Sequence, residues 1–474
     1  MRGVARNFAF GFAEKYFQAA LALASSMALA RLLSPAQIGI YSIAAVLTGL
    51  AQVFRDLGTG QLLVARRDLS TEEQRALLAI SIAMGWSLAL LLAALAEPLA
   101  GFYRQPALAQ VLRILSLNFV LVPFSSQATA MLRREMRAGA LLRVTVCYST
   151  TQFAATLALA ANGLGPDALA WGSFAATLAG FAVALIQQPA GMAWRPGWRG
   201  AGALLRPGGL AVTGNAIDEI GVVAPDLVAG KLLGPEEVAL LGKAQAVLSL
   251  FNQAVTSAVS PVVFPLFARQ AREGGDPLQA YIETAACMTA LSWPFFVFAG
   301  LFAGPLVSLL YGDQWQASVP LIRIMCGAAA LYSMFSMGRY LLVATGHIGE
   351  QAKIDALAVM GRVAMLLPAG MAGLPWLAVA VALSLVLRSL LVLRSLRSLY
   401  GLGLERLLQA VRKSAVATGA ATAPGLLVLA AVRDEAGALH LLAGAVAGAL
   451  GWGLAIWLQR HPLAGLLRRT EWQQ

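Results

Sequence analysis

Polar and charged side chains follow one face of four otherwise apolar segments, centred near residues 20, 48, 218 and 250. Each set repeats at the spacing of a single helical face. A charge within a bilayer costs ~2.5–3.5 kcal/mol, so such residues normally face protein or water. The four sets are Asn7, Glu14, Gln18 and Ser25; Ser42, Gln52, Arg55, Asp56 and Thr59; Asn215, Asp218, Glu219 and Asp226; and Gln245, Ser249, Asn252, Thr256 and Ser260.

The same face is polar in two parts of the chain. Under a shift of 200 residues, Gln18 falls on Asp218 and Gln52 falls on Asn252. The apolar pattern also recurs, because residues 28–43 resemble residues 227–242. Two copies of a multi-helix unit with a substrate path between them are typical of transporters. We therefore expect the four polar faces to line one central cavity; hydrogen bonding between helices, worth ~0.6 kcal/mol per contact, is the alternative.

The basic residues of this set predict an anionic ligand. Arginine offers a planar fork of donors that matches phosphate. Arg113 and Arg323 are repeat-equivalent, each followed by Ile, although snorkelling to the interface is an alternative for both. The candidate substrate-binding residues are Lys15, Gln18, Gln52, Arg55, Arg113, Arg323 and Asn252.

The acidic residues near residue 218 predict ion coupling. Asp218, Glu219 and Asp226 lie beside Pro225, which cannot donate to the carbonyl of Gly221. A kink or unwound turn is expected there, and broken helices beside carboxylates are common at coupling sites. A partly dehydrated carboxylate can bind a proton in the working pH range, and a nearby cation such as Lys15 or Lys243 would oppose that shift. A merely bent structural helix is the alternative.

Several other chemistries find no support in the sequence. The histidines His347, His440 and His461 are scattered, the three cysteines lie in apolar segments, and no phosphate-binding glycine loop is present. We expect no metal, no cofactor and no catalytic residue. The outer loops are short and carry a single Asp313 in GPLVSLLYGDQW, which disfavours a membrane glycosyl polymerase or ligase.

The elements that must position these residues are membrane-spanning helices. Hydrophobic residues make up 59% of the chain and charged residues 12%. Apolar stretches of about 20 residues, each long enough to cross a bilayer, recur about fourteen times. We predict an all-α integral membrane protein with two six-helix lobes, residues 1–200 and 201–400, related by pseudo-two-fold symmetry. Residues 401–474 would add an interfacial segment and a terminal helix pair.

The net charge of +12 reflects topology rather than nucleic-acid binding. With the N-terminus inside, the outer loops keep only Arg31, Arg104, Lys231 and Arg433, and the other loop cations are cytoplasmic. The basic stretch Arg388 to Lys413 fits anionic headgroups. We therefore expect a multi-pass protein of the bacterial inner membrane with both termini in the cytoplasm, bounded by membrane lipids.

Two segments, residues 30–58 and 311–325, resemble Wzx-type flippases of the multidrug/oligosaccharidyl-lipid/polysaccharide exporter superfamily. The resemblance implies two six-helix lobes around a central cationic cavity. It also implies transfer of an undecaprenyl-pyrophosphate-linked oligosaccharide from the cytoplasmic to the periplasmic leaflet by alternating access. Contact with the polysaccharide polymerase machinery would follow. The alternative is an ion-coupled multidrug or organic-cation antiporter of the same superfamily, which would usually have twelve helices and an acidic cavity.

Overall fold

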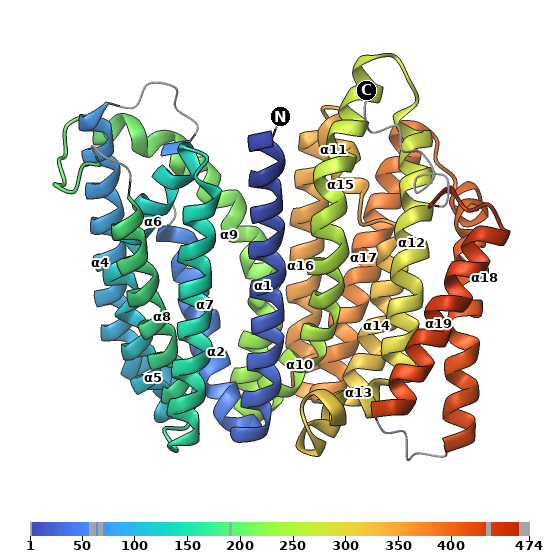
Figure 1. The fold of residues 1–474 in the computed structure, drawn as a ribbon, viewed down its shortest axis with the longest axis horizontal. Coiled ribbons are helices and arrows are strands. Elements are labelled where there is room, and N and C mark those ends of the chain that lie inside the picture. Colours follow the sequence, from blue (N-terminus) through green and yellow to red (C-terminus); the bar gives the residue numbers. More distant parts are fainter. Residues whose placement is uncertain (1, 56–62, 65–69, 189–191, 433–437, 464–474) are drawn as a thin grey trace. The chain divides into compact units, whose positions relative to one another are not determined.

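The computed structural model describes residues 2–55, 63–64, 70–188, 192–432 and 438–463, and every regular element in these ranges is helical (Figure 1). Within them, the side chains of residues 2–9, 12, 203–218, 429–432 and 438–439 fall outside the description. By packing, the chain divides into unit 1, residues 1–239, and unit 2, residues 240–474.

Unit 1 contains eight helices in its described ranges and the start of a ninth. They are α1 (Arg2–Leu32), α2 (Pro35–Arg55), α4 (Thr71–Tyr103), α5 (Ala107–Ser116), α6 (Asn118–Arg134), α7 (Ala138–Ala161), α8 (Pro166–Gln187), α9 (Ala201–Leu232) and the beginning of α10 (Pro235–Phe251). Because α9 packs on α2 and α4, the packing boundary lies one helix later than the boundary of the predicted repeat. The repeat itself stays a prediction.

Unit 2 contains the rest of α10 and the following elements. They are the π-helical turn η1 (Asn252–Thr256), α11 (Ser257–Arg272), α12 (Pro277–Leu301), α13 (Ala303–Leu310), the 3-10 turn η2 (Asp313–Ser318), α14 (Val319–Ser333), α15 (Gly338–Ala344), α16 (Ile348–Ala372), α17 (Leu374–Tyr400), α18 (Leu404–Val432) and α19 (Ala438–Leu458).

Local sequence explains where several helices begin. Ser70 and Glu73 form a reciprocal capping box at the start of α4, in which each side chain accepts from the other residue's backbone N–H. Asp276 caps α12 by accepting from the N–H of Gln279 at 3.0 Å. Proline occupies the first turn of α8 and α12, where no backbone donor is needed.

The fourteen predicted apolar segments all coincide with helices or with consecutive helix pairs. In the described ranges, eleven spans are long and apolar enough to cross a membrane. The prediction of an all-α membrane fold is therefore confirmed. The basic stretch from Arg388 to Lys413 closes α17, turns at Gly401 with φ 68°, and opens α18, so it is divided between two helices; its place at the membrane interface stays a prediction.

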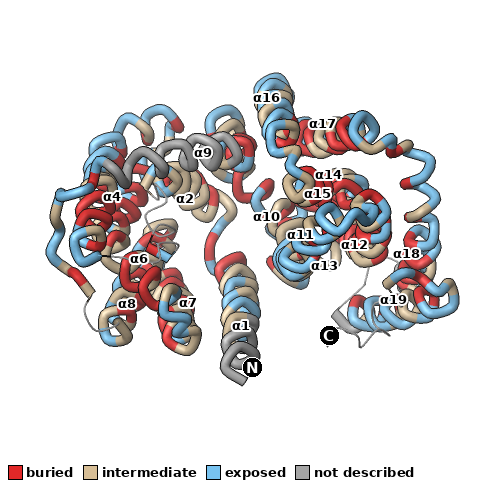
Figure 2. The backbone as a smooth tube through the Cα atoms, turned by 90° about the horizontal axis from the view of Figure 1, so that it is seen from above, coloured by how far each residue is buried: buried red, intermediate tan, exposed pale blue. Residues whose placement is uncertain are grey.

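The helices of unit 1 pack through small residues. A Cβ on Gly172 of α8 would meet the hydroxyl of Thr156 on α7 at 1.9 Å. On α4, a Cβ at Gly85 would meet the carbonyl oxygen of Phe119 at 2.7 Å. Figure 2 shows the buried faces of α6, α7 and α8 turned towards one another. This packing holds α6, α7 and α8 at fixed spacings around the cavity described below.

In unit 2, the terminal pair α18–α19 is attached to α12. The indole of Trp452 donates to the carbonyl of Ala290 at 2.8 Å. The buried hydroxyl of Ser414 donates to the carbonyl of Ala286 at 2.9 Å and contacts Nε2 of His461 at 3.2 Å. Polar groups this deep normally need partners, and here the two helices and α12 supply them.

Candidate functional site: a polar cavity in unit 1

Unit 1 encloses a cavity of about 440 Å³ that five of its longer helices and the end of α5 line. Its wall consists of Gln18 of α1; Tyr41, Ala45, Thr48, Gln52 and Arg55 of α2; Leu115 of α5; Asn118, Phe119, Val122, Ser125, Ser126 and Thr129 of α6; Val144, Thr145 and Tyr148 of α7; and Ser173, Thr177, Gly180 and Phe181 of α8.

Helical periodicity brings these residues together. On α2 the wall residues stand at 41, 45, 48, 52 and 55, and on α6 at 118, 122, 125 and 129. These are the i, i+3/4, i+7 positions of one face. Gly180 of α8 allows close approach of α7, because a Cβ there would already lie 3.3 Å from the ring of Tyr148.

Arg55 is the one charged residue of this described wall. Its guanidinium lies over the ring of Phe119, 6.0 Å from the centroid. The hydroxyl of Thr145, itself a wall residue, donates to the carboxylate of Glu14 on α1 at 2.7 Å. The cavity is thus hydroxyl- and amide-rich with a single cation, an arrangement that can hold a polar ligand bearing negative charge.

The structure brings together three of the seven predicted substrate-binding residues, Gln18, Gln52 and Arg55. Lys15 is exposed on α1 and does not belong to the wall. Arg113 is paired with the carboxylate of Glu97 at 2.7 Å, and both side chains are largely exposed. The sequence pattern placed Arg113 in the cavity, whereas in the structure it pairs with Glu97 at the surface.

The other predicted substrate residues lie in unit 2. Arg323 is exposed near the start of α14, and Asn252 is exposed in the π-helical turn η1. Asn252 begins this turn, in which each backbone hydrogen bond spans five residues instead of the four of an α-helix. Single π-helical turns inside α-helices are frequent at functional sites.

No unwound turn lies beside Pro225, because α9 continues as one helix from Ala201 to Leu232, and the kink stays a prediction. Glu219 and Asp226 are half-buried on it, and the side chain of Asp218 lies outside the described residues. The irregular backbone lies instead at η1, in the helix that carries the polar line of Asn252. Proline removes one backbone donor and crowds the preceding turn, but membrane-spanning helices tolerate it where neighbouring groups satisfy the freed carbonyl.

Lys243, expected as a partner for the acidic residues, is buried in unit 2 between aromatic rings. Its ammonium lies 4.3 Å from the centroid of Tyr311 and 4.8 Å from that of Trp315. Both rings belong to the segment YGDQW that carried the family resemblance. Tyr311 and Trp315 of that segment therefore make cation–π contacts with Lys243.

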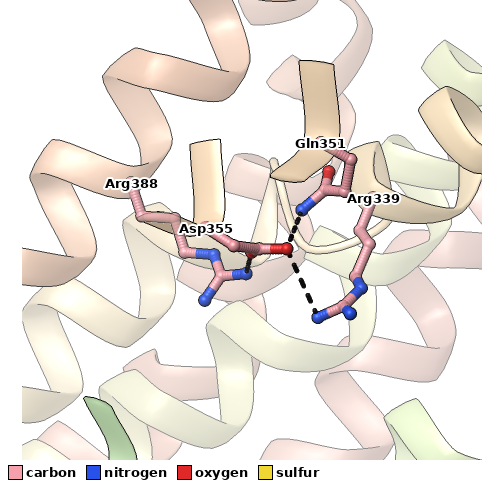
Figure 3. Close-up of polar contacts among 4 residues, drawn as sticks. All are labelled: Arg339, Gln351, Asp355 and Arg388. Carbon is pink, nitrogen blue, oxygen red and sulfur yellow. Dashed lines mark hydrogen bonds and ion pairs between the residues drawn. The ribbon is translucent and has the colours of Figure 1, made fainter. Parts of the chain in front are cut away.

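A second polar cluster lies where α15, α16 and α17 meet (Figure 3). Asp355 of α16 accepts hydrogen bonds from Arg388 of α17 and, at 2.9 Å, from Gln351. Arg339 of α15 approaches the same carboxylate at 3.8 Å. The Asp355 side chain is only 12% exposed, so one buried carboxylate joins three helices. In the described residues, no group of three His, Cys, Asp or Glu side chains could hold a metal ion.

The sequence patterns missed most of the wall from α6, α7 and α8. Asn118, Ser125 and Thr129 recur at helical spacing, so a signal existed. Isolated Ser and Thr in apolar helices, however, are usually interhelical contacts. Under the shift of 200, Ser125 and Thr129 fall on the apolar residues Met325 and Ala329, and the repeat argument therefore passed over them.

Comparison with known proteins identifies the family. The model of the family described as "Polysaccharide biosynthesis protein" matches residues 28–320. The chain is 21% identical over 313 residues to the teichuronic acid biosynthesis protein TuaB of Bacillus subtilis, covering 63% of this chain and 62% of that protein. It is 26% identical over 405 residues to the succinoglycan biosynthesis transport protein ExoT of Rhizobium meliloti, covering 83% and 80%.

Solved structures share the fold. The lipid II flippase MurJ in an inward closed conformation superposes with a TM-score of 0.77 at 13% identity, covering 96% of this chain and all of that one. An inward-facing multidrug transporter of the MATE family gives 0.65 at 13% identity, covering 83% and 96%. By its sequence, the chain belongs to the family described as polysaccharide biosynthesis protein, and it shares the fold of these flippase and multidrug-transporter structures.

Proposed function

We propose that this protein flips a lipid-linked saccharide with an anionic phosphate head from the cytoplasmic to the periplasmic leaflet of the bacterial inner membrane. The observation that carries the proposal is the cavity of unit 1, in which Arg55 stands among amides and hydroxyls. An undecaprenyl-pyrophosphate-linked oligosaccharide has matching parts. Its pyrophosphate pairs with a guanidinium, its sugars bond to polar groups, and its lipid stays in the bilayer.

Transport would follow an alternating-access cycle. The polar wall replaces water around the head group. Without it, the free-energy cost of moving the head group through hydrocarbon would be prohibitive. The family membership and the names of the relatives support a role in polysaccharide biosynthesis. The inward bias of loop arginines supports cytoplasmic termini. A polymerase that receives the flipped saccharide is the expected partner.

An organic-cation antiporter is the second candidate, supported by the likeness to the MATE fold. The charge of the cavity wall disfavours an organic cation as the ligand. Its one charged residue is Arg55, and a cationic drug would meet a like charge at short range. A neutral or anionic saccharide meets no such repulsion.

The test uses purified protein in lipid vesicles with a polyprenyl-pyrophosphate-linked saccharide. Arg55→Gln removes a charge-assisted contact worth ~1.5–3 kcal/mol, so binding of this lipid should weaken about 10- to 150-fold and its flipping should slow in step. Arg113→Gln is the matched control, because Arg113 lies at the surface beside Glu97 and does not line the cavity. Equal effects of the two variants, or a wild type that transports an organic cation and not the lipid, would refute the proposal.

A further inference from the structure

We infer that residues 192–199 form a strap that docks on α4 and α6 in this conformation and must release from them during each transport cycle. The strap lies between α8 and α9 in the chain, within unit 1, and has no helical residue. The inference rests on the proposed function, because it assigns one moving part to the alternating-access cycle. The contacts that hold the strap reach the back of the cavity wall.

Two buried glutamines hold the backbone of the strap. Gln74 of α4 accepts from the N–H of Ala193 at 3.3 Å, and the amide of Gln127 on α6 donates to the carbonyl of Ala193 at 3.3 Å. The same amide also donates to the carbonyl of Gln74 at 3.4 Å. Further along the strap, the N–H of Gly197 donates to the carbonyl of Arg75 at 3.1 Å. The docked strap therefore ties α4 to α6.

Two apolar side chains of the strap complete the docking. Met192 packs on a buried cluster that includes Leu77 of α4 and Met131 of α6. Trp194 packs on a second cluster, which includes Val144 of α7. Because Val144 also lines the cavity, the strap reaches the cavity wall from behind.

A row of aromatic rings leads from the strap to the cavity. The ring centroid of Trp194 lies 6.4 Å from that of Phe124 on α6, which lies 6.1 Å from that of Phe181 on α8. Phe181 lines the cavity, and so do Ser125 and Ser126, the next two residues of α6. A movement of α6 against α4 that alters access to the cavity must therefore break the contacts of the strap.

The docked state is only partly satisfied. The two side-chain bonds to Ala193 are longer than is usual for N–H donors. Oε1 of Gln127 is buried and has no hydrogen-bond partner among the described residues, which destabilises the docked state. The ion pair between Arg199 and Glu72, at 3.8 Å, is exposed and contributes little. Segments held by so few buried contacts open at low free-energy cost.

The outer side of the strap suits a released position at the membrane surface. Arg195, Trp198 and Arg199 are all exposed. Tryptophan favours the headgroup level of a bilayer, and arginine favours anionic headgroups. Release would leave these three side chains in a favourable environment and would uncover little apolar surface beyond Met192 and Trp194.

The experiment locks the strap with a disulfide between Arg75→Cys and Gly197→Cys. A Cβ on Gly197 would lie 3.3 Å from that of Arg75, close to the ~3.5–4.5 Å of disulfides. The native cysteines Cys147, Cys287 and Cys326 are replaced by alanine. After oxidation, flipping of the polyprenyl-pyrophosphate-linked saccharide in vesicles should fall at least tenfold below that of the reduced sample, and reductant should restore it.

The matched control locks a contact in unit 2. A Cβ on Gly300 of α12 would lie 3.7 Å from that of Cys326 on α14, so Gly300→Cys in a chain that keeps Cys326 gives an equivalent disulfide. This disulfide should leave flipping unchanged. Equal flipping by the oxidised and reduced strap variants, a loss that reductant does not reverse, or an equal loss in the control would overturn the inference.

A second measurement needs no disulfide. Ala193 of the strap and Ala455 of α19 are both 8% exposed, so cysteines at the two positions start from matched burial. In the purified full-length protein without native cysteines, Ala193→Cys should react with a water-soluble maleimide at least tenfold faster than Ala455→Cys, because release of the strap uncovers it. Equal rates at the two positions would show that the strap stays docked.

The two proposals fail separately. If wild-type vesicles flip the phosphorylated lipid and the disulfide between residues 75 and 197 leaves flipping unchanged, the strap inference is wrong and the proposed function stands. If wild-type vesicles flip no lipid, the proposed function is wrong, and the maleimide rates alone decide whether the strap releases.

Discussion

Gly39 of α2 lies directly against the carbonyl group of Pro235 at the start of α10, so that a Cβ on Gly39 would stand 1.7 Å from that oxygen. Four residues further along α2, Ile43 fills the space over Gly230 of α9, where a Cβ would lie 3.0 Å from its side chain. Glycine thus stands at both points of close approach, Gly39 on α2 and Gly230 on α9.

The first prediction follows from this contact. Gly39→Ala should force α2 and the start of α10 apart, because the atom in the way is backbone and cannot rotate aside. Overpacking of this kind costs about 1–3 kcal/mol or more. Thermal unfolding in detergent should show a clear loss of stability, and export of saccharide in cells should fall with it.

Gly49→Ala in the same helix is the control. The Cβ position of Gly49 has nothing within 4 Å, so this change should be neutral or, through helix propensity, slightly stabilising. If the two alanine variants unfold at the same temperature, the contact between Gly39 and Pro235 has no role in stability.

The second prediction contrasts two ion pairs. Asp355→Asn should destabilise the protein by about 3–5 kcal/mol, because it leaves Arg388 and Arg339 facing a neutral group in a site where Asp355 is 12% exposed. Glu97→Gln should change stability by less than about 1 kcal/mol, because its pair with Arg113 is exposed. Unfolding of both variants, of Arg388→Gln, and of Asp355→Asn combined with Arg388→Gln measures the difference. A double variant that simply adds the two single losses would show that Asp355 and Arg388 are not coupled.

The third prediction concerns the pH dependence of stability. Burial, with a smaller contribution from Lys413, lowers the pKa of His461 from 6.5 to about 4. Its Nδ1 accepts from the N–H of Leu463 at 3.1 Å, so the neutral ring carries its proton on Nε2, towards Ser414. Between these two pH values the unfolded chain binds more protons than the folded one. The free energy of unfolding should therefore fall as pH decreases from about 6.5 to about 4.

His461→Gln should flatten this pH dependence of the unfolding temperature, although the variant loses some stability at neutral pH. His347→Gln serves as the comparison, because that histidine contacts Thr345 and Tyr400 away from the terminal pair. An unchanged acid profile in His461→Gln would place the acid sensitivity elsewhere in the chain.

The fourth prediction concerns ion coupling, which we propose for the half-buried carboxylates of α9. A carboxylate that binds and releases a proton or cation during the cycle biases the protein between its two states. Glu219→Gln should then abolish the response of flipping to a collapsed proton or sodium gradient, with Asp226→Asn and Asp218→Asn giving weaker effects. Normal, gradient-dependent flipping in all three variants would assign these residues a structural role.

Sequence reasoning located the helices well because about 20 apolar residues in a row have one stable outcome in a bilayer. It also found Gln18, Gln52 and Arg55, whose amides and charge stand out on an apolar face. It placed Arg113 in the cavity because an arginine near a helix end has the same local pattern whether it faces a cavity or a surface carboxylate such as Glu97. Tyr148 and Ser173 reach the wall through tertiary packing, which no local spacing encodes.

The π-helical turn from Asn252 to Thr256 has a geometric consequence for the internal repeat. One extra residue in a turn advances every later side chain by about 100° around the helix axis, since a regular turn takes 3.6 residues. The described part of α2, which ends at Arg55, contains no such insertion. The side chains from Ser257 onward therefore point about 100° away from the direction that an uninterrupted α-helix would give them. The polar line predicted from Gln245 to Ser260 passes from one face of the helix to another at this turn.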